Sequence, residues 1–97
     1  MKDELKPIAL NNNKDLNRFE LTVDGHTAFI TYDYRGEVIR LLHTESPQEL
    51  AGKGVGSALV EKTLDYIKEH NLKLKPLCPF VHSYIERHSE WKPFVAE

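Results

Sequence analysis

The stretch that decides the fold is a glycine-rich loop that opens a helix, Leu50-Ala51-Gly52-Lys53-Gly54-Val55-Gly56-Ser57. Glycines at this spacing leave successive backbone N–H groups free to point outward at the positive end of a helix, where they can wrap a phosphate. The spacing matches neither the G-x-G-x-x-G pattern of dinucleotide folds nor the G-x-x-x-x-G-K-[ST] pattern of P-loops. Spacing alone therefore leaves two alternatives open, a phosphate cradle and a glycine-rich turn that binds no ligand.

The residues after the loop predict a helix over residues 55–69. Its apolar side chains cover one half of the helical wheel, and the residues concerned are Val55, Leu59, Val60, Thr63, Leu64, Tyr66 and Ile67. Such a helix lies with one face on a sheet. Gly56 falls near the middle of that face, and we expect it to let the first turn approach the strands closely.

The residues before the loop predict three antiparallel strands. Apolar and polar side chains alternate over residues 19–23, and Asp24-Gly25 supplies the positive-φ pair of a tight hairpin turn. The return strand runs over residues 26–34, and after a turn at Gly36 the third strand runs over residues 38–44.

A fourth strand is expected over residues 72–75, where Pro76 ends it. Pro79 suits the first turn of a short second helix that runs through Ile85. The element order is β-β-β-α-β-α, and the crossover helix should make the third and fourth strands parallel neighbours. The fold class is therefore α+β, with a mixed sheet.

The length of the chain, 97 residues, is enough for a single hydrophobic core. Residues 1–17 show little periodicity, so we expect a loosely attached N-terminal arm that can add a short edge strand. The single domain is expected to span residues 18–97.

The overall charge excludes some classes of partner. Thirteen basic and fifteen acidic side chains give a net charge of −2, so no global field attracts nucleic acid or an anionic membrane. No apolar run approaches the roughly 20 residues that span a bilayer, and the first residues lack the features of a signal peptide. We expect a cytoplasmic protein without nucleic-acid or membrane partners.

The single cysteine, Cys78, excludes an internal disulfide and any metal site built from several thiolates. Cys78 and His82 are spaced to share a metal on a helix, but no further ligands are evident, so no metal is expected.

The stretch HTESPQELAGKGVGSALV, from His43 to Val60, resembles motif A of the GNAT superfamily of N-acetyltransferases. In that superfamily a Q/R-x-x-G-x-G/A loop grips the pyrophosphate of acetyl-coenzyme A. Together with the later CPFV segment, the HTE and GKGVGS segments resemble a group of very small GNAT-like proteins. The resemblance covers roughly residues 19–92. Ala51 replaces the Gln or Arg of the pattern, so the cradle would rely mainly on backbone groups, with Lys53 as the nearest cation.

The resemblance also implies which residues bind acetyl-coenzyme A. They lie at the end of the third strand, in the glycine loop and in the second helix, and they are Leu42, His43, Thr44, Gly52, Lys53, Gly54, Val55, Gly56, Ser57, Cys78, Arg87 and His88. Arg87 and His88 would meet the adenosine 3′-phosphate, the alternative being a solvated basic helix end.

Four candidate catalytic residues follow. His43 or Glu45 would accept a proton from the amine, and Tyr84 would protonate the departing thiolate. Cys78, at a helix start that can lower its thiol pKa, could act as a nucleophile. The structural alternatives are a hydrogen-bonded histidine, a solvated carboxylate, a tyrosine packed in the core and a small buried cysteine.

The resemblance thus implies an N-acetyltransferase that moves an acetyl group from acetyl-coenzyme A to a primary amine, which could be a protein lysine, a polyamine or a small amine. We expect a monomer or weak dimer. The chain lacks the two helices that roof the acceptor site in larger GNAT enzymes, so the acceptor site should be open. The alternatives are a non-catalytic module on the same fold, binding acyl-coenzyme A or a partner, and a small nucleotide-binding domain.

Overall fold

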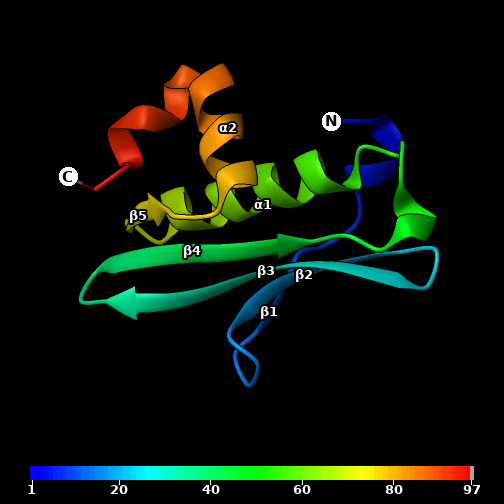
Figure 1. Cartoon of the computed structure of the whole chain (residues 1–97), viewed down its shortest axis with the longest axis horizontal. Helices are drawn as coiled ribbons and strands as arrows, with labels where there is room; N and C mark the ends of the chain where they lie inside the picture. The colour runs from blue at the N-terminus through cyan, green and yellow to red at the C-terminus, as the bar shows by residue number, and fades with distance from the viewer. Residues whose placement is uncertain (97) are drawn as a thin grey trace.

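The computed structural model describes residues 1–96 and shows a five-stranded sheet with its helices on one face (Figure 1). The elements are η1 Asp3–Leu5, β1 Asn11–Asn13, β2 Arg18–Val23, β3 His26–Arg35, β4 Val38–Glu45, η2 Gln48–Leu50, α1 Val55–Glu69, β5 Lys73–Pro76, α2 Pro79–Arg87 and η3 Ser89–Phe94. This order confirms the α+β class and the β-β-β-α-β-α succession. Glu97, the last residue of the expected domain, lies outside the described residues.

The strands lie in the order β1-β2-β3-β4-β5. The first four are antiparallel, and β4 and β5 are parallel because α1 carries the chain across the sheet between them. The tight turn between β2 and β3 is confirmed, since Asp24 and Gly25 both have positive φ, at 51° and 79°.

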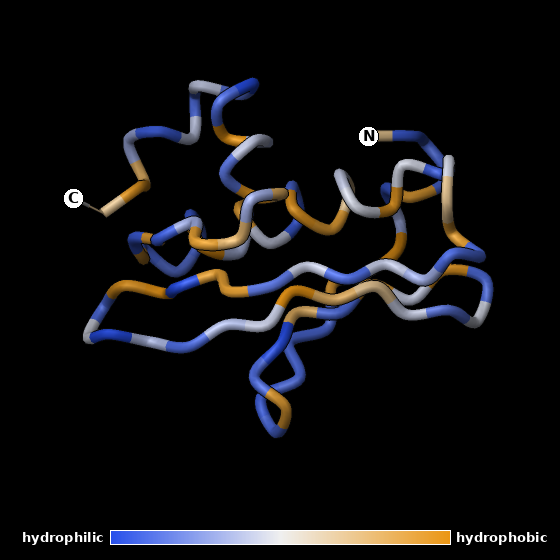
Figure 2. Tube along the Cα trace, in the orientation of Figure 1, coloured by the Kyte–Doolittle hydropathy of each residue, from blue (hydrophilic) through white to orange (hydrophobic). Residues whose placement is uncertain are grey.

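The core lies between the sheet and α1. Alternate side chains of β3, namely Ala28, Ile30 and Tyr32, are buried under the helix, and the expected face of α1 is buried too, except that Tyr66 is only half-buried and Ala58 joins the face. Figure 2 shows hydrophobic segments along the strands and α1, whereas the turn between β3 and β4 is hydrophilic.

The N-terminal arm is more firmly held than its sequence indicates. Leu5 is 2% exposed and belongs to the core, with Ile8 and Leu10 packed against it. The expected edge strand is present, with Asn12 of β1 opposite Phe19 of β2. A few isolated apolar residues produce no periodic signal, but each can still occupy a site on an existing core.

Gly56 has a different neighbour from the one expected. A Cβ at this position would lie 3.0 Å from Cζ of Phe80 in α2, so the missing side chain makes room for α2 rather than for the strands. The helical wheel shows which side of α1 is covered, but not which element covers it.

The opposite face of the sheet carries no helix in the described part of the chain (Figure 1). Within residues 1–96, none of the helices is both long enough and apolar enough to cross a membrane.

Candidate functional site

The two parallel strands β4 and β5 diverge halfway along β4. Their pairing ends at Leu41 and Pro76. The carbonyl of Leu41 then accepts hydrogen bonds from the N–H groups of both Leu77 and Cys78, each at 3.0 Å, as the chain turns away into α2. Beyond Leu41, β4 continues to Glu45 paired with β3 alone. One edge of its last four residues is therefore left without a β5 partner.

A β-bulge at Leu42 decides where the side chains at the end of β4 point. Tyr32 lies opposite Leu41 and Thr31 lies opposite His43, so Leu42 is the extra residue. The bulge reverses the alternation of faces along the strand. It is a feature that the apolar pattern of β4 did not reveal.

The bulge separates the candidate residues of β4 onto two faces. Thr44 lies opposite the buried Ile30 and so faces the helices. His43 and Glu45 lie opposite Thr31 and Phe29, on the open face of the sheet.

Thr44 meets Cys78 across the divergence. The thiol of Cys78 donates to the hydroxyl oxygen of Thr44 at 3.2 Å, and Cys78 is only 4% exposed. Burial acts to raise the pKa of the Cys78 thiol. After deprotonation, however, the thiolate accepts hydrogen bonds from the rotated Thr44 hydroxyl and from the N–H groups of Val81 and Phe80, and these outweigh burial and lower the pKa below its ordinary value. This direction is the one expected for a thiol at a helix N-terminus.

His43 and Glu45 form a loose pair on the open face. His43 Nε2 lies 3.8 Å from Glu45 Oε2, and both side chains are largely exposed. Glu45 also lines a pocket of about 260 Å³ on this face, together with Thr27, Phe29, Ser46 and Pro47. Two groups that can accept protons thus lie beside a small cavity with an aromatic wall.

Tyr84 lies in α2 and is buried, with 6% of its surface exposed. Its ring stacks on His88, with the centroids 4.0 Å apart. Burial raises the pKa of the Tyr84 hydroxyl, and the nearby carboxylates of Glu61, Glu90 and Asp65 raise it further. The hydroxyl therefore stays protonated at neutral pH.

Arg87 and His88 lie at the far end of α2. Phe80, at the start of this helix, is the residue that contacts Gly56 of the glycine loop. Arg87 lies seven positions after Phe80 on this helix, which is about 10 Å along the axis. The Nδ1 atom of His88 lies 2.9 Å from the Tyr84 carbonyl oxygen. The structure thus does not gather this pair around the loop.

The glycine loop has the expected geometry. Gly52 and Gly54 have φ of 77° and 74°, and Gly54 is the N-cap of α1. The N-terminus has no side-chain cap, and no acidic residue lies in the first turn. Ala58 is the first residue to donate back to Gly54, so the N–H groups of residues 55–57 have no partner within the helix. Unpaired N–H groups at a helix N-terminus are the kind of groups to which anions bind in proteins.

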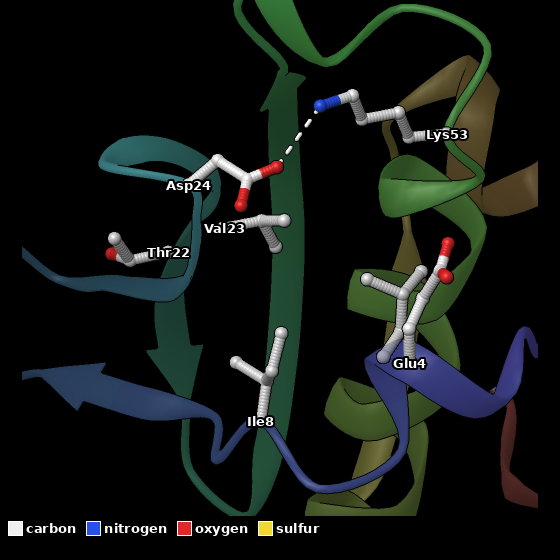
Figure 3. A pocket seen from close by; sticks show the side chains of 7 residues that line it. Glu4, Ile8, Thr22, Val23, Asp24 and Lys53 are labelled. Carbon is white, nitrogen blue, oxygen red and sulfur yellow. Dashed lines mark hydrogen bonds and ion pairs between the residues drawn. The ribbon is translucent and has the colours of Figure 1, made fainter.

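Lys53 turns away from this helix end. Its ammonium lies 3.0 Å from a carboxylate oxygen of Asp24, at the side of a neighbouring pocket of about 370 Å³ (Figure 3). Leu5, Ile8, Thr22, Val23 and Glu4 also line this pocket. Because it contains the carboxylates of Glu4 and Asp24, this pocket does not suit a phosphate.

A lysine that the sequence did not single out lies on the loop instead. The ammonium of Lys2 donates a hydrogen bond to the Gly52 carbonyl at 3.2 Å, across 50 positions of sequence. No motif predicts a contact of this kind, since it depends on how the arm packs.

Two further features bear on what the site can bind, namely exposed apolar side chains and groups that could hold a metal. Leu42, Leu77 and Phe80 are apolar side chains exposed by 38%, 53% and 36% around the divergence. Within residues 1–96, the structure shows no group of three or more His, Cys, Asp or Glu side chains that could hold a metal ion.

A glycine-rich helix start beside two diverging parallel strands, together with this fold, defines a domain of the acyltransferase type. Residues 18–94 match the family model described as GCN5-related N-acetyl-transferase, and the chain belongs to that family. The expected superfamily is thereby confirmed.

Relatives and a solved structure agree with this assignment. The chain is 28% identical to Protein NATD1 of Mus musculus over 83 residues, which are 82% of this chain and 76% of the mouse protein. It is 28% identical to Protein NATD1 of Homo sapiens, with 82% and 74% covered. The solution NMR structure of a GCN5-like protein from Staphylococcus aureus superposes with a TM-score of 0.70 at 26% identity, covering 94% of this chain and 90% of that one.

Proposed function

We propose that this protein binds acetyl-coenzyme A and transfers its acetyl group to a primary amine. The observation that carries the proposal is the uncapped, glycine-lined start of α1 next to the divergence of β4 and β5, in a chain of this family. A Cβ added at Gly52 would meet no atom within 4 Å, so there is open space beside the loop. The free N–H groups of residues 55–57 suit a pyrophosphate at that place.

The unpaired edge of β4 suits the pantetheine arm. Beyond Leu41 this edge can exchange hydrogen bonds with the amide groups of an extended ligand, as an added strand would. Leu42, Leu77 and Phe80 offer apolar contact to the methylene groups of the arm. The loop and the strand edge would thus hold the two halves of acetyl-coenzyme A.

The chemistry would proceed by direct transfer. The amine nitrogen attacks the thioester carbonyl carbon, His43 or Glu45 takes the proton that the nitrogen loses, and the carbon–sulfur bond breaks. The leaving thiolate takes a proton from Tyr84, whose raised pKa keeps it protonated at neutral pH. Cys78 and Thr44 would shape the wall beside the thioester.

The open sheet face suits a large acceptor. His43 and Glu45 lie on this face, which carries no helix in the described part of the chain. A lysine side chain of a protein or a polyamine could therefore approach as readily as a small amine, whereas a single compact substrate would be poorly enclosed.

A non-catalytic acyl-coenzyme A-binding module is the second candidate. Two observations favour it: Tyr84 is buried and stacked on His88, and the thiol of Cys78 is already bonded to Thr44. If this packing persists with ligand bound, the Tyr84 hydroxyl stays buried and does not reach the thioester sulfur. Binding would then occur without turnover.

Two measurements test the proposal in sequence. Titration with acetyl-coenzyme A, followed by amide NMR, should shift the signals of residues 52–57 and 42–45, and ATP or NAD should not compete. Release of free coenzyme A is then measured with a panel of amines that contains a lysine peptide, a polyamine and a small amine. Binding with no release would select the module, and no binding would reject both candidates.

A further inference from the structure

The N-terminal arm places one positive charge directly on the glycine loop. Leu5 is buried in the core, and its N–H donates to the Lys2 carbonyl at 3.0 Å, so the start of the arm is tied to the body of the protein. The Lys2 side chain then runs across Gly54, with Cε 3.7 Å from the place where a Cβ would stand, and its ammonium reaches the Gly52 carbonyl.

The electrostatics of this position are unfavourable without an anion. The N-terminus of a helix carries a partial positive charge, which repels a cation. The first turn of α1 contains no acidic residue to compensate. In the described part of the chain, Lys53 is paired with Asp24 and Lys6 with Asp3, whereas the ammonium of Lys2 bonds to a neutral carbonyl. An anion at the loop would relieve the repulsion.

We propose that Lys2 is a phosphate-binding residue that contacts the pyrophosphate of acetyl-coenzyme A at the glycine loop. This inference rests on the proposed function and assigns a binding role to the arm. Ala51 stands where a Gln or Arg side chain would assist the loop, and Lys53 is held by Asp24. Lys2 supplies the missing cation from the N-terminal arm, by exchanging the Gly52 carbonyl for a phosphate oxygen.

The test compares two lysines of the arm. Lys2→Gln removes the charge at the loop. Lys6→Gln is the matched control, because it makes the same charge change on the same arm at a residue paired with Asp3. Calorimetry with acetyl-coenzyme A should show about tenfold weaker binding for Lys2→Gln, because one charge-assisted hydrogen bond to the ligand is lost. Lys6→Gln should bind like the wild type, and Lys2→Arg should retain most of the affinity.

The salt dependence of the affinity gives a second readout, which would not change if Lys2 only stabilised the fold. The affinity of the wild type should fall more steeply with ionic strength than that of Lys2→Gln, because one ionic contact has been removed. Amide NMR spectra of the free variants verify that both are folded.

The outcomes separate the two proposals. Equal affinity of Lys2→Gln and the wild type would overturn the role of Lys2 and leave the loop site intact. Tighter binding by Lys2→Gln would mean that Lys2 covers the loop, which also overturns it. If the wild type itself does not bind acetyl-coenzyme A, the proposed function fails, and the role of Lys2 fails with it.

Discussion

The thiol of Cys78 lies 3.2 Å from the hydroxyl oxygen of Thr44, a contact that joins the start of α2 to the end of β4 across 34 positions of sequence. Thr44 reaches this face of the sheet because the bulge at Leu42 reverses the alternation of β4. The contact therefore connects two features of the candidate site, the divergence of the strands and the helix start that follows it.

Replacing Thr44 by Val should raise the pKa of the Cys78 thiol. Burial raises this pKa, and the Thr44 hydroxyl is the largest of the influences that lower it, so its removal shifts the balance upward. The ¹³Cβ signal of labelled Cys78 followed against pH measures the pKa, and Thr44→Ser, which keeps the hydroxyl, is the control. An unchanged pKa in Thr44→Val would show that the backbone N–H groups alone stabilise the thiolate.

The same shift has a consequence for stability. A thiol whose folded-state pKa is lowered adds stability that is absent below that pKa and complete above the unfolded-state pKa near 9.0. The free energy of unfolding of the wild type should therefore rise relative to Thr44→Val as the pH increases toward 9.0. Chemical denaturation at a series of pH values measures the difference.

Cys78 should not carry the acetyl group during turnover. It is 4% exposed and faces the helices, whereas His43 and Glu45 lie on the opposite face. The buried thiol is also bonded to Thr44, so it has little freedom to attack the thioester carbonyl. Intact mass measurement after incubation with acetyl-coenzyme A alone should show no adduct, and Cys78→Ala should stay active. An adduct that an added amine removes at the turnover rate would instead demonstrate a relay.

Gly54→Ala should weaken binding of acetyl-coenzyme A far more than Gly36→Ala. Both glycines have positive φ, 74° and 61°, so both variants carry a similar strain of about 1–2 kcal/mol. Only the Cβ at Gly54 stands at the helix start, where it also touches Lys2. Denaturation measures the strain, and calorimetry measures the binding. Equal losses of affinity would place the ligand away from the loop.

The effect of Gly56→Ala on the free energy of unfolding should depend on Phe80. Alanine improves helix propensity by about 1 kcal/mol, but its Cβ would lie 3.0 Å from Cζ of Phe80. We expect Gly56→Ala to raise the free energy of unfolding little in the wild type and clearly in the Phe80→Leu background, because that second substitution removes the contact. The four free energies of unfolding form a double-mutant cycle. Additive effects would mean that α2 moves aside without cost.

Local patterns were enough to predict most of the elements. The strands over residues 19–23, 26–34 and 38–44, the helix over residues 55–69 and the tight turn at Asp24-Gly25 all appear close to their expected bounds. Periods of two and of 3.6 residues reflect which side of an element is covered, and positive φ at Gly depends on the residue itself. The buried side of an element and the positive φ of a glycine thus depend on residues that are close together in the sequence. The glycine loop was predictable for the same reason.

The sequence by itself therefore determined the order of the elements, their buried faces and the glycine-lined start of α1. Only the tertiary structure decided that Leu42 is a bulge, that Thr44 meets Cys78 while His43 and Glu45 face the other way, and that Lys2 lies on Gly52. A bulge depends on how two strands pair, and each of these contacts joins residues brought together by packing. Such relationships have no local period, so they arise only when the arm, the sheet and the helices close around one core.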